Sequence, residues 1–220
     1  MRILILNPNS TQAMTDSMLA AARAALPEAE ITGWTNHDGP PAIQGPEDGE
    51  AAVAGVLALL PAARAEGFQA IVLACFDDTG LAQIRRAASC PVLGIGEAAF
   101  HLAALQGQRF AVVTTLPVSI PVIEENIAAY GFGGICAGVE ASGLAVLEVE
   151  EATPASMARL SAALTAAAKP GVEALVLGCA GMALLRPALQ ETSPLPLIDG
   201  VAAACWLATA LIRAERAKAA

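Results

Sequence analysis

Two apolar runs in this sequence end in the same way, each with a cysteine that is followed by small or polar residues. The first run, AIVLAC, ends at Cys75, and the second, ALVLGC, ends at Cys179, 104 positions later. Gly96 and Gly200 repeat this separation, and each of them follows a further short apolar run. Short runs rich in Ile, Val and Leu are typical of strands that are buried on both faces. The matched spacings predict a chain built from two similar halves.

The order of strands and helices predicts the fold class. Six runs have strand character: 2–6, 70–74, 91–95, 109–113, 174–178 and 194–198. Alanine-rich stretches with helical spacing lie between most of them: 15–26, 49–65, 96–105, 120–131, 154–168 and 200–217. Such alternation is typical of α/β folds with parallel sheets. We therefore predict two pseudo-symmetric lobes, 1–104 and 105–220, each a mainly parallel sheet flanked by helices, with the last helices crossing between them. Ligands bind beyond the carboxyl ends of parallel strands, so we expect the active site in the cleft between the lobes.

Charge and hydropathy exclude several classes of protein. The 220 residues carry 12 basic and 21 acidic side chains without a basic cluster, which argues against nucleic-acid binding. The chain has no apolar run long enough to predict a membrane span and no signal-peptide core at its start, so we expect a cytoplasmic protein whose partner is a small molecule. The mean hydropathy of +0.57 predicts a homo-oligomer.

The five cysteines are odd in number and widely spaced, which argues against a disulfide framework or a zinc site. Cys90, Cys136 and Cys205 are interpreted as structural. Cys75 and Cys179 are also open to that interpretation, because cysteine is often buried. At a strand end that leads into a helix, however, backbone N–H groups and the helix dipole are expected to lower the pKa of a thiol towards neutrality. One thiolate then removes a proton from an acidic carbon, and a second thiol returns a proton to the other face, which inverts a stereocentre.

The sequence resembles the aspartate/glutamate/hydantoin racemase superfamily over essentially its whole length, and within it the hydantoin and allantoin racemases. The resemblance rests on the motifs ILNPNST..MT (5–15), GP.AIQG..D (39–48), ACFDDTGL (74–81), PVLGIGEAA (91–99), LGCAGMA (177–183) and P.IDGVAAA (196–204). It implies racemisation without a cofactor, with Cys75 and Cys179 as the two catalytic bases. Hydantoin racemases usually read C-F-D-D-P-G, and this chain departs from that pattern at Thr79.

The residues after each cysteine favour a ring substrate. Relatives that act on free aspartate or glutamate usually carry C-N-T and G-C-T there, whereas this chain has Phe76-Asp77 and Ala180-Gly181. An aromatic wall and small residues suit a flat, neutral ring, so we expect inversion at C5 of a 5-substituted hydantoin or of allantoin. An aspartate or glutamate racemase, or a binding protein of the same fold without catalysis, remains an alternative.

Three groups of residues are expected to bind the substrate. The resemblance assigns the loop after the first strand to the substrate site, although Ser10 or Thr11 could instead cap the next helix. Backbone N–H groups near the cysteines could stabilise a developing enolate, and Asp77 and Asp78 could instead be helix caps. The loop 34–48 could form a lid. The candidate substrate-binding residues are Asn9, Ser10, Phe76, Asp77, Thr79, Gly80, Thr114, Thr115, Ala180 and Gly181.

We expect no cofactor. The segment GIGEAA fits the dinucleotide pattern G-x-G-x-x-A, but the next strand ends in Thr114-Thr115 and offers no acid for a ribose. Pyridoxal phosphate needs a Schiff-base lysine, and neither Lys169, in a linker, nor Lys218, near the end of the chain, is well placed for that role.

Overall fold

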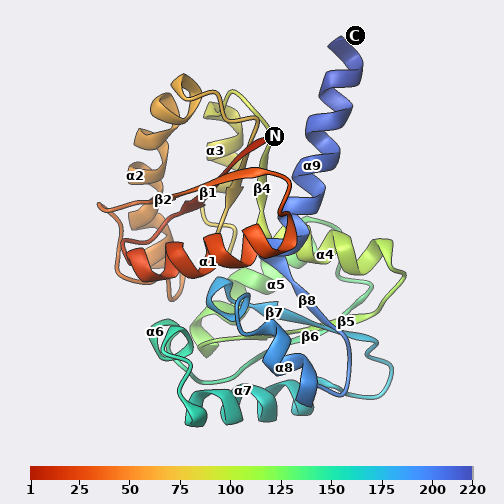
Figure 1. Cartoon of the computed structure of the whole chain (residues 1–220). Coiled ribbons are helices and arrows are strands. Elements are labelled where there is room, and N and C mark those ends of the chain that lie inside the picture. The colour runs from red at the N-terminus through yellow and green to blue at the C-terminus, as the bar shows by residue number, and fades with distance from the viewer. Residues whose placement is uncertain (220) are drawn as a thin grey trace.

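Two parallel sheets of four strands form the framework of the computed structural model, which describes residues 1–219 (Figure 1). The first sheet has the order β2-β1-β3-β4, with β1 (Arg2–Asn7), β2 (Glu30–Thr35), β3 (Ala70–Leu73) and β4 (Val92–Gly94). The second has the order β6-β5-β7-β8, with β5 (Phe110–Thr114), β6 (Cys136–Ala141), β7 (Ala174–Gly178) and β8 (Leu197–Asp199). The same strand order in both halves confirms the predicted α/β fold with two pseudo-symmetric lobes.

Helices flank both sheets, as predicted. In the described part of the chain they are α1 (Gln12–Ala25), α2 (Pro46–Ala65), α3 (Leu81–Ala87), α4 (Ile95–Leu105), α5 (Ile120–Ala129), α6 (Val146–Glu150), α7 (Pro154–Ala167), α8 (Arg186–Thr192) and α9 (Gly200–Ala219). Two short 3-10 helices, η1 (Pro117–Ser119) and η2 (Ala180–Met182), follow strands β5 and β7. None of the described helices is long and apolar enough to cross a membrane.

The two outer strands β2 and β6 were not predicted from the sequence. Both lie at the edge of a sheet and pair on one side only, with β1 and β5 respectively. These two strands are partly exposed, and only Ile31 and Thr35 of β2 and Val139 of β6 are buried. The central strands β1, β3, β5 and β7 are almost entirely buried, which explains why their apolar runs were recognised.

Helices α4 and α9 pack between the two sheets. Helix α9, from the end of the chain, contacts β3 and β4 of the first sheet, and α4 contacts β7 and β8 of the second. Figure 1 shows α9 crossing to the first lobe before its last turns extend away from the body. Because these helices belong to both lobes, the limits 1–104 and 105–220 stay a prediction.

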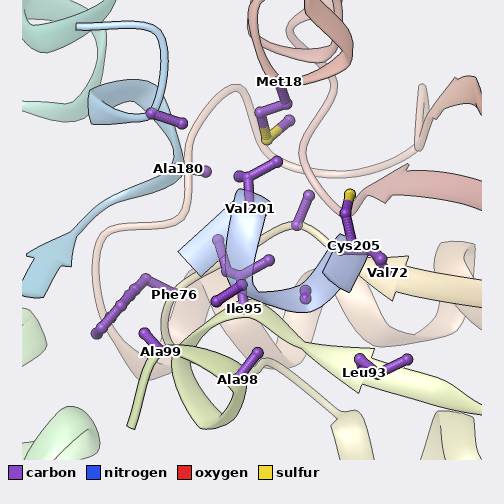
Figure 2. Packing of buried hydrophobic residues seen from close by; sticks show 14 of the residues in the cluster. Met18, Val72, Phe76, Leu93, Ile95, Ala98, Ala99, Ala180, Val201 and Cys205 are labelled. Atoms are coloured by element: carbon purple, nitrogen blue, oxygen red, sulfur yellow. The ribbon is translucent and has the colours of Figure 1, made fainter. Parts of the chain in front are cut away.

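One hydrophobic cluster joins the halves, since it contains Ile5 of β1, Val72 of β3, Val112 of β5 and Val176 of β7. Figure 2 shows part of this cluster, where Cys205 of α9 lies beside Val72. Cys205 is fully buried, which agrees with its interpretation as a structural residue.

Candidate active site

The strands β3 and β7, one from each lobe, end at one small cavity between the lobes. Cys75 follows β3 after one residue and Cys179 follows β7 directly, and both line this cavity of about 30 Å³. Each cysteine is partly exposed as a whole residue, as expected for a residue that borders a cavity. The full lining consists of Asn9, Met14, Ile43, Ala74, Cys75, Phe76, Asp77, Thr114, Thr115, Ser119, Val146, Gly178, Cys179 and Ala180.

Eight of the twelve residues predicted for the site share this cavity, and the other four lie around it. Thr79 and Gly80 line a separate outer cleft of about 530 Å³ on the far side of the loop that carries Cys75. Thr79 nevertheless contacts the site, because its Oγ1 donates a hydrogen bond to the sulfur of Cys75 at 3.6 Å. The backbone N–H of Gly181 donates a hydrogen bond to the sulfur of Cys179. Ser10 is half-buried outside the cavity, where its N–H bonds to the carbonyl of Pro40 at 2.9 Å.

Six residues of the lining were not predicted from the sequence. Ala74 and Gly178 directly precede the two cysteines, and the other four are Met14, Ile43, Ser119 and Val146. Their side chains resemble those of any packed core, and only the placement of loops and helix ends brings them to the site. Ile43 belongs to the loop predicted as a lid. The next residue, Gln44, accepts a hydrogen bond from the N–H of Val146 at 3.1 Å, which fastens this loop across the cleft.

The thiols differ from expectation in their acidity. Burial raises the pKa of Cys75 well above its usual range, with a further contribution from the negative charge of Asp77. Burial likewise raises the pKa of Cys179, to about 12. Donors that favour the thiolate are present as predicted: Thr79 and the N–H of Asp77 for Cys75, and the N–H groups of Gly181 and Met182 for Cys179. The predicted fall towards neutrality was wrong for this closed site, because desolvation outweighs these donors.

The loop after β1 has an internal hydrogen-bond network that orients Asn9. Its Oδ1 accepts from the side chain of Asn7 at 2.9 Å and from the N–H of Thr11 at 3.0 Å. Its Nδ2 contacts only the sulfur of Met14, at 3.4 Å, which leaves donor capacity at the cavity wall. The alternative interpretation of this loop was wrong, since neither Ser10 nor Thr11 caps α1 with its side chain.

The two aspartates after Phe76 have different surroundings. The carboxylate of Asp78 accepts hydrogen bonds from the N–H groups of Gly96 and Glu97, at 3.0 and 2.7 Å, and from the hydroxyl of Tyr130 at 3.1 Å. Asp78 therefore caps α4 and not α3, the helix that follows it in sequence. Its carboxylate also occupies the position at the start of α4 where a dinucleotide phosphate would bind.

Asp77 lines the cavity with few partners of its own. The hydroxyl of Ser119 lies 3.5 Å from its Oδ2, and Asn126 holds its backbone carbonyl at 2.9 Å. Burial raises the pKa of Asp77 to about 7, and the contact with Ser119 acts in the opposite direction. Among the described residues, no group of three or more His, Cys, Asp or Glu side chains is arranged to hold a metal ion.

The fold and the site together define a class of protein: a two-lobed α/β protein in which two thiols from equivalent strands face one cavity between the lobes. The model of the Asp/Glu/Hydantoin racemase family matches residues 3–208, and the chain belongs to this family. It is therefore an enzyme of the isomerase class.

Individual relatives agree with this assignment. A hydantoin racemase from Rhizobium meliloti is 41% identical over 216 residues, which cover 97% of this chain and 90% of the relative. The structure of an allantoin racemase from Klebsiella pneumoniae superimposes with a TM-score of 0.91 at 38% identity, covering 97% of this chain and 88% of the other. An allantoin racemase structure from Pseudomonas fluorescens gives a TM-score of 0.87 at 34% identity, covering 98% and 92%.

Proposed function

We propose that this enzyme racemises hydantoin-type rings at C5, allantoin among them, with Cys75 and Cys179 as the two acid/base groups. The observation that carries the proposal is the placement of both thiols on one cavity, at the ends of equivalent strands. The relatives named hydantoin racemase and allantoin racemase support the choice of ring.

The reaction needs one thiolate and one thiol. The thiolate takes the proton from C5, and the electrons of the broken C–H bond move into the adjacent C4 carbonyl to give an enolate. The second thiol then donates its proton to the opposite face of C5 and becomes a thiolate. One proton leaves C5 and one is returned, and one thiolate is present before and after the reaction. The ring leaves with inverted configuration.

The remaining lining suits a neutral ring better than a free amino acid. Met14, Phe76 and Val146 supply apolar walls, and the amide of Asn9 supplies a hydrogen-bond donor. The lining residues include no Lys, Arg or His that could pair with the carboxylates of aspartate or glutamate. A buried carboxylate without a partner is costly, which disfavours the amino-acid alternative.

The test follows the optical rotation of enantiopure 5-alkylhydantoin and allantoin in heavy water, with deuterium at C5 measured by mass spectrometry. Wild-type enzyme is expected to racemise the ring with deuterium uptake, faster than the spontaneous reaction. Cys75→Ser and Cys179→Ser should each abolish racemisation. The thiol that remains reaches only one face, so each variant should exchange the C5 proton of a single enantiomer without inversion.

Cys90→Ser is the matched control, because Cys90 lies outside the cavity, and it should keep full activity. A wild-type rate no faster than the spontaneous reaction on every ring would sink the proposal. Parallel assays with aspartate and glutamate test the other racemase function, and binding without turnover would point to the non-catalytic alternative.

A further inference from the structure

The cavity contains a third ionisable group besides the two thiols. Of the residues that line it, only Cys75, Asp77 and Cys179 can gain or lose a proton near neutral pH. Asp77 follows Cys75 by two residues, and its charge affects the pKa of both thiols. The racemisation proposed above uses the thiols and leaves this carboxyl group without a role.

Asp77 differs from the neighbouring Asp78 in how its carboxyl group is held. Asp78 is fully buried and Asp77 is mostly buried, and three donors from the protein satisfy the oxygens of Asp78. The carboxyl group of Asp77 has only the hydroxyl of Ser119, at 3.5 Å, while Asn126 fixes its backbone. A carboxylate that is buried with so few donors is unfavourable in its charged form. The geometry therefore favours a neutral carboxyl group with an O–H available to the cavity.

The negative charge that moves through the cavity during the reaction also favours a neutral Asp77. One negative charge passes from the first thiolate to the substrate and then to the second thiol. An ionised Asp77 would place a second negative charge in the same enclosed space, and it raises the pKa of both Cys75 and Cys179. A neutral Asp77 removes this repulsion throughout the proton transfer.

We propose that Asp77 works as a neutral carboxylic acid that donates a hydrogen bond to the enolate oxygen formed at C4 of the ring. The proposal rests on the function proposed above. The proton stays on Asp77, so the hydrogen bond stabilises the developing charge and changes nothing in the balance of the reaction. A donor held in place before the reaction begins is the usual means of stabilising such an oxyanion.

The groups around Asp77 set the expected pH dependence. Cys75 and Cys179 face it from the cavity, and Ser119 contacts it from η1. The outer cleft, which Asp77 also lines, contributes four further titratable or charged groups: Glu50, Asp78, Arg86 and Tyr130. Burial raises the pKa of Asp77 to about 7, so activity should decline above neutral pH as the donor is lost.

Two substitutions separate a neutral donor from a charged group. Asp77→Asn keeps the size and an N–H donor but cannot ionise, so it should retain kcat within about tenfold and lose the decline above pH 7. Asp77→Ala removes the donor and should lower kcat by about 100-fold, the usual cost of losing one oxyanion donor. Asp78→Asn is the matched control: it weakens the cap of α4 and should lower the melting temperature while the decline above pH 7 remains.

A second readout does not depend on turnover. Carbon-13 NMR spectra are recorded for enzyme labelled at the aspartate carboxyl carbons. The signal of Asp77 is the one that is absent from the spectrum of the Asp77→Asn variant. Its titration midpoint is expected near pH 7, and a midpoint near 4, the ordinary value for aspartate, would overturn the proposal.

The outcomes also separate this proposal from the proposed function. An active wild-type enzyme with an Asp77→Asn variant as slow as Asp77→Ala would show that the charge is needed, and would overturn only the role of Asp77. A wild-type enzyme that racemises no ring substrate would overturn both.

Discussion

The two thiols of the site hold equivalent positions but have different hydrogen-bond donors. The sulfur of Cys75 accepts hydrogen bonds from the hydroxyl of Thr79 and the N–H of Asp77. The sulfur of Cys179 accepts them from two backbone N–H groups, those of Gly181 and Met182. The residue that corresponds to Thr79 after the second cysteine is Ala183, so the hydroxyl has no counterpart. The pseudo-symmetry of the fold therefore does not extend to the hydrogen-bond donors of the two thiols.

Replacing Thr79 tests whether this hydroxyl supports the Cys75 thiolate. Thr79→Val removes the donor and should lower kcat/KM by about tenfold, since a hydrogen bond to a charged group contributes about 1.5 kcal/mol or more. The two enantiomers have equal free energies in solution, so kcat/KM must fall by the same factor for both. The individual values of kcat and KM can still change differently for each enantiomer. Thr79→Ser restores the hydroxyl and should recover most of the rate. Equal activity of the Val and Ser variants would contradict the assignment.

Sequence patterns predicted the two cysteines that line the cavity better than its apolar walls. The strand-end cysteines could be recognised because their position repeats after 104 residues. Met14 and Ile43 gave no such signal, since an apolar side chain in a helix or a loop fits a core as well as a cavity. The pKa values of the thiols could not be predicted from the sequence either. They depend mainly on how deeply the thiols are buried, and this depends on how closely the lobes meet.

At the scale of elements, two helices begin so close to another stretch of backbone that only glycine fits near their first turn. A Cβ atom on Gly96 would lie 2.4 Å from the carbonyl oxygen of Phe76, and one on Gly200 would lie 2.4 Å from that of Ile95. Both contacts are with backbone, which cannot rotate away. The start of α4 is thus packed directly against the loop that carries Cys75 and Asp77, which keeps this loop in place.

Gly96→Ala and Gly200→Ala should therefore both destabilise the protein. Forcing an extra carbon into a packed region costs about 1–3 kcal/mol, which corresponds to a fall in melting temperature of about 5 °C for a chain of this size. Gly133→Ala is the matched control, because a Cβ atom there meets nothing within 4 Å. Thermal unfolding by circular dichroism measures all three. A melting temperature for Gly96→Ala or Gly200→Ala equal to that of the control would refute the close packing.

The sheets illustrate which elements a sequence reveals. All six predicted strand runs overlap strands of the structure, because their residues are buried on both faces. The strands β2 and β6 escaped prediction, since their sequences EITGWT and CAGVEA mix small, polar and apolar residues without a buried run. The apolar runs thus located β1, β3, β4, β5, β7 and β8 and the site at the strand ends, while β2 and β6 became visible only in the folded chain.

At the scale of the whole molecule, the structure is a closed state. The cavity of about 30 Å³ has room for about two water molecules, which is much less than a hydantoin ring needs. Contacts across the cleft hold it shut, among them the bond from Val146 to Gln44 and the bond from Ser17 to Glu150. For the proposed racemisation, the ring therefore has to enter while the lobes are further apart, and closure around it would bring both thiols to C5 and exclude water.

The buried carboxyl groups should also make the stability of the whole molecule depend on pH. Burial raises the pKa of Asp77 and of Asp78 to about 7, and raises the pKa of Glu150 and Asp199 as well. In the unfolded chain these groups titrate near pH 4. Between about pH 4 and 7 the folded protein consequently binds more protons than the unfolded chain, and its free energy of unfolding falls as the pH rises through this range.

The expected result is a melting temperature that declines by several degrees from pH 5 to pH 8, measured by calorimetry at constant ionic strength. Asp77→Asn cannot ionise, so it should flatten the decline, whereas Glu28→Gln, which changes an exposed carboxylate, should leave it as in the wild type. A melting temperature that rises over this range, or an identical decline in Asp77→Asn, would mean that Asp77 is already ionised near pH 5 in the folded protein. Because a neutral Asp77 is also the donor proposed for the enolate, its contribution to the decline in stability should level off near pH 7, the pH around which activity is expected to fall.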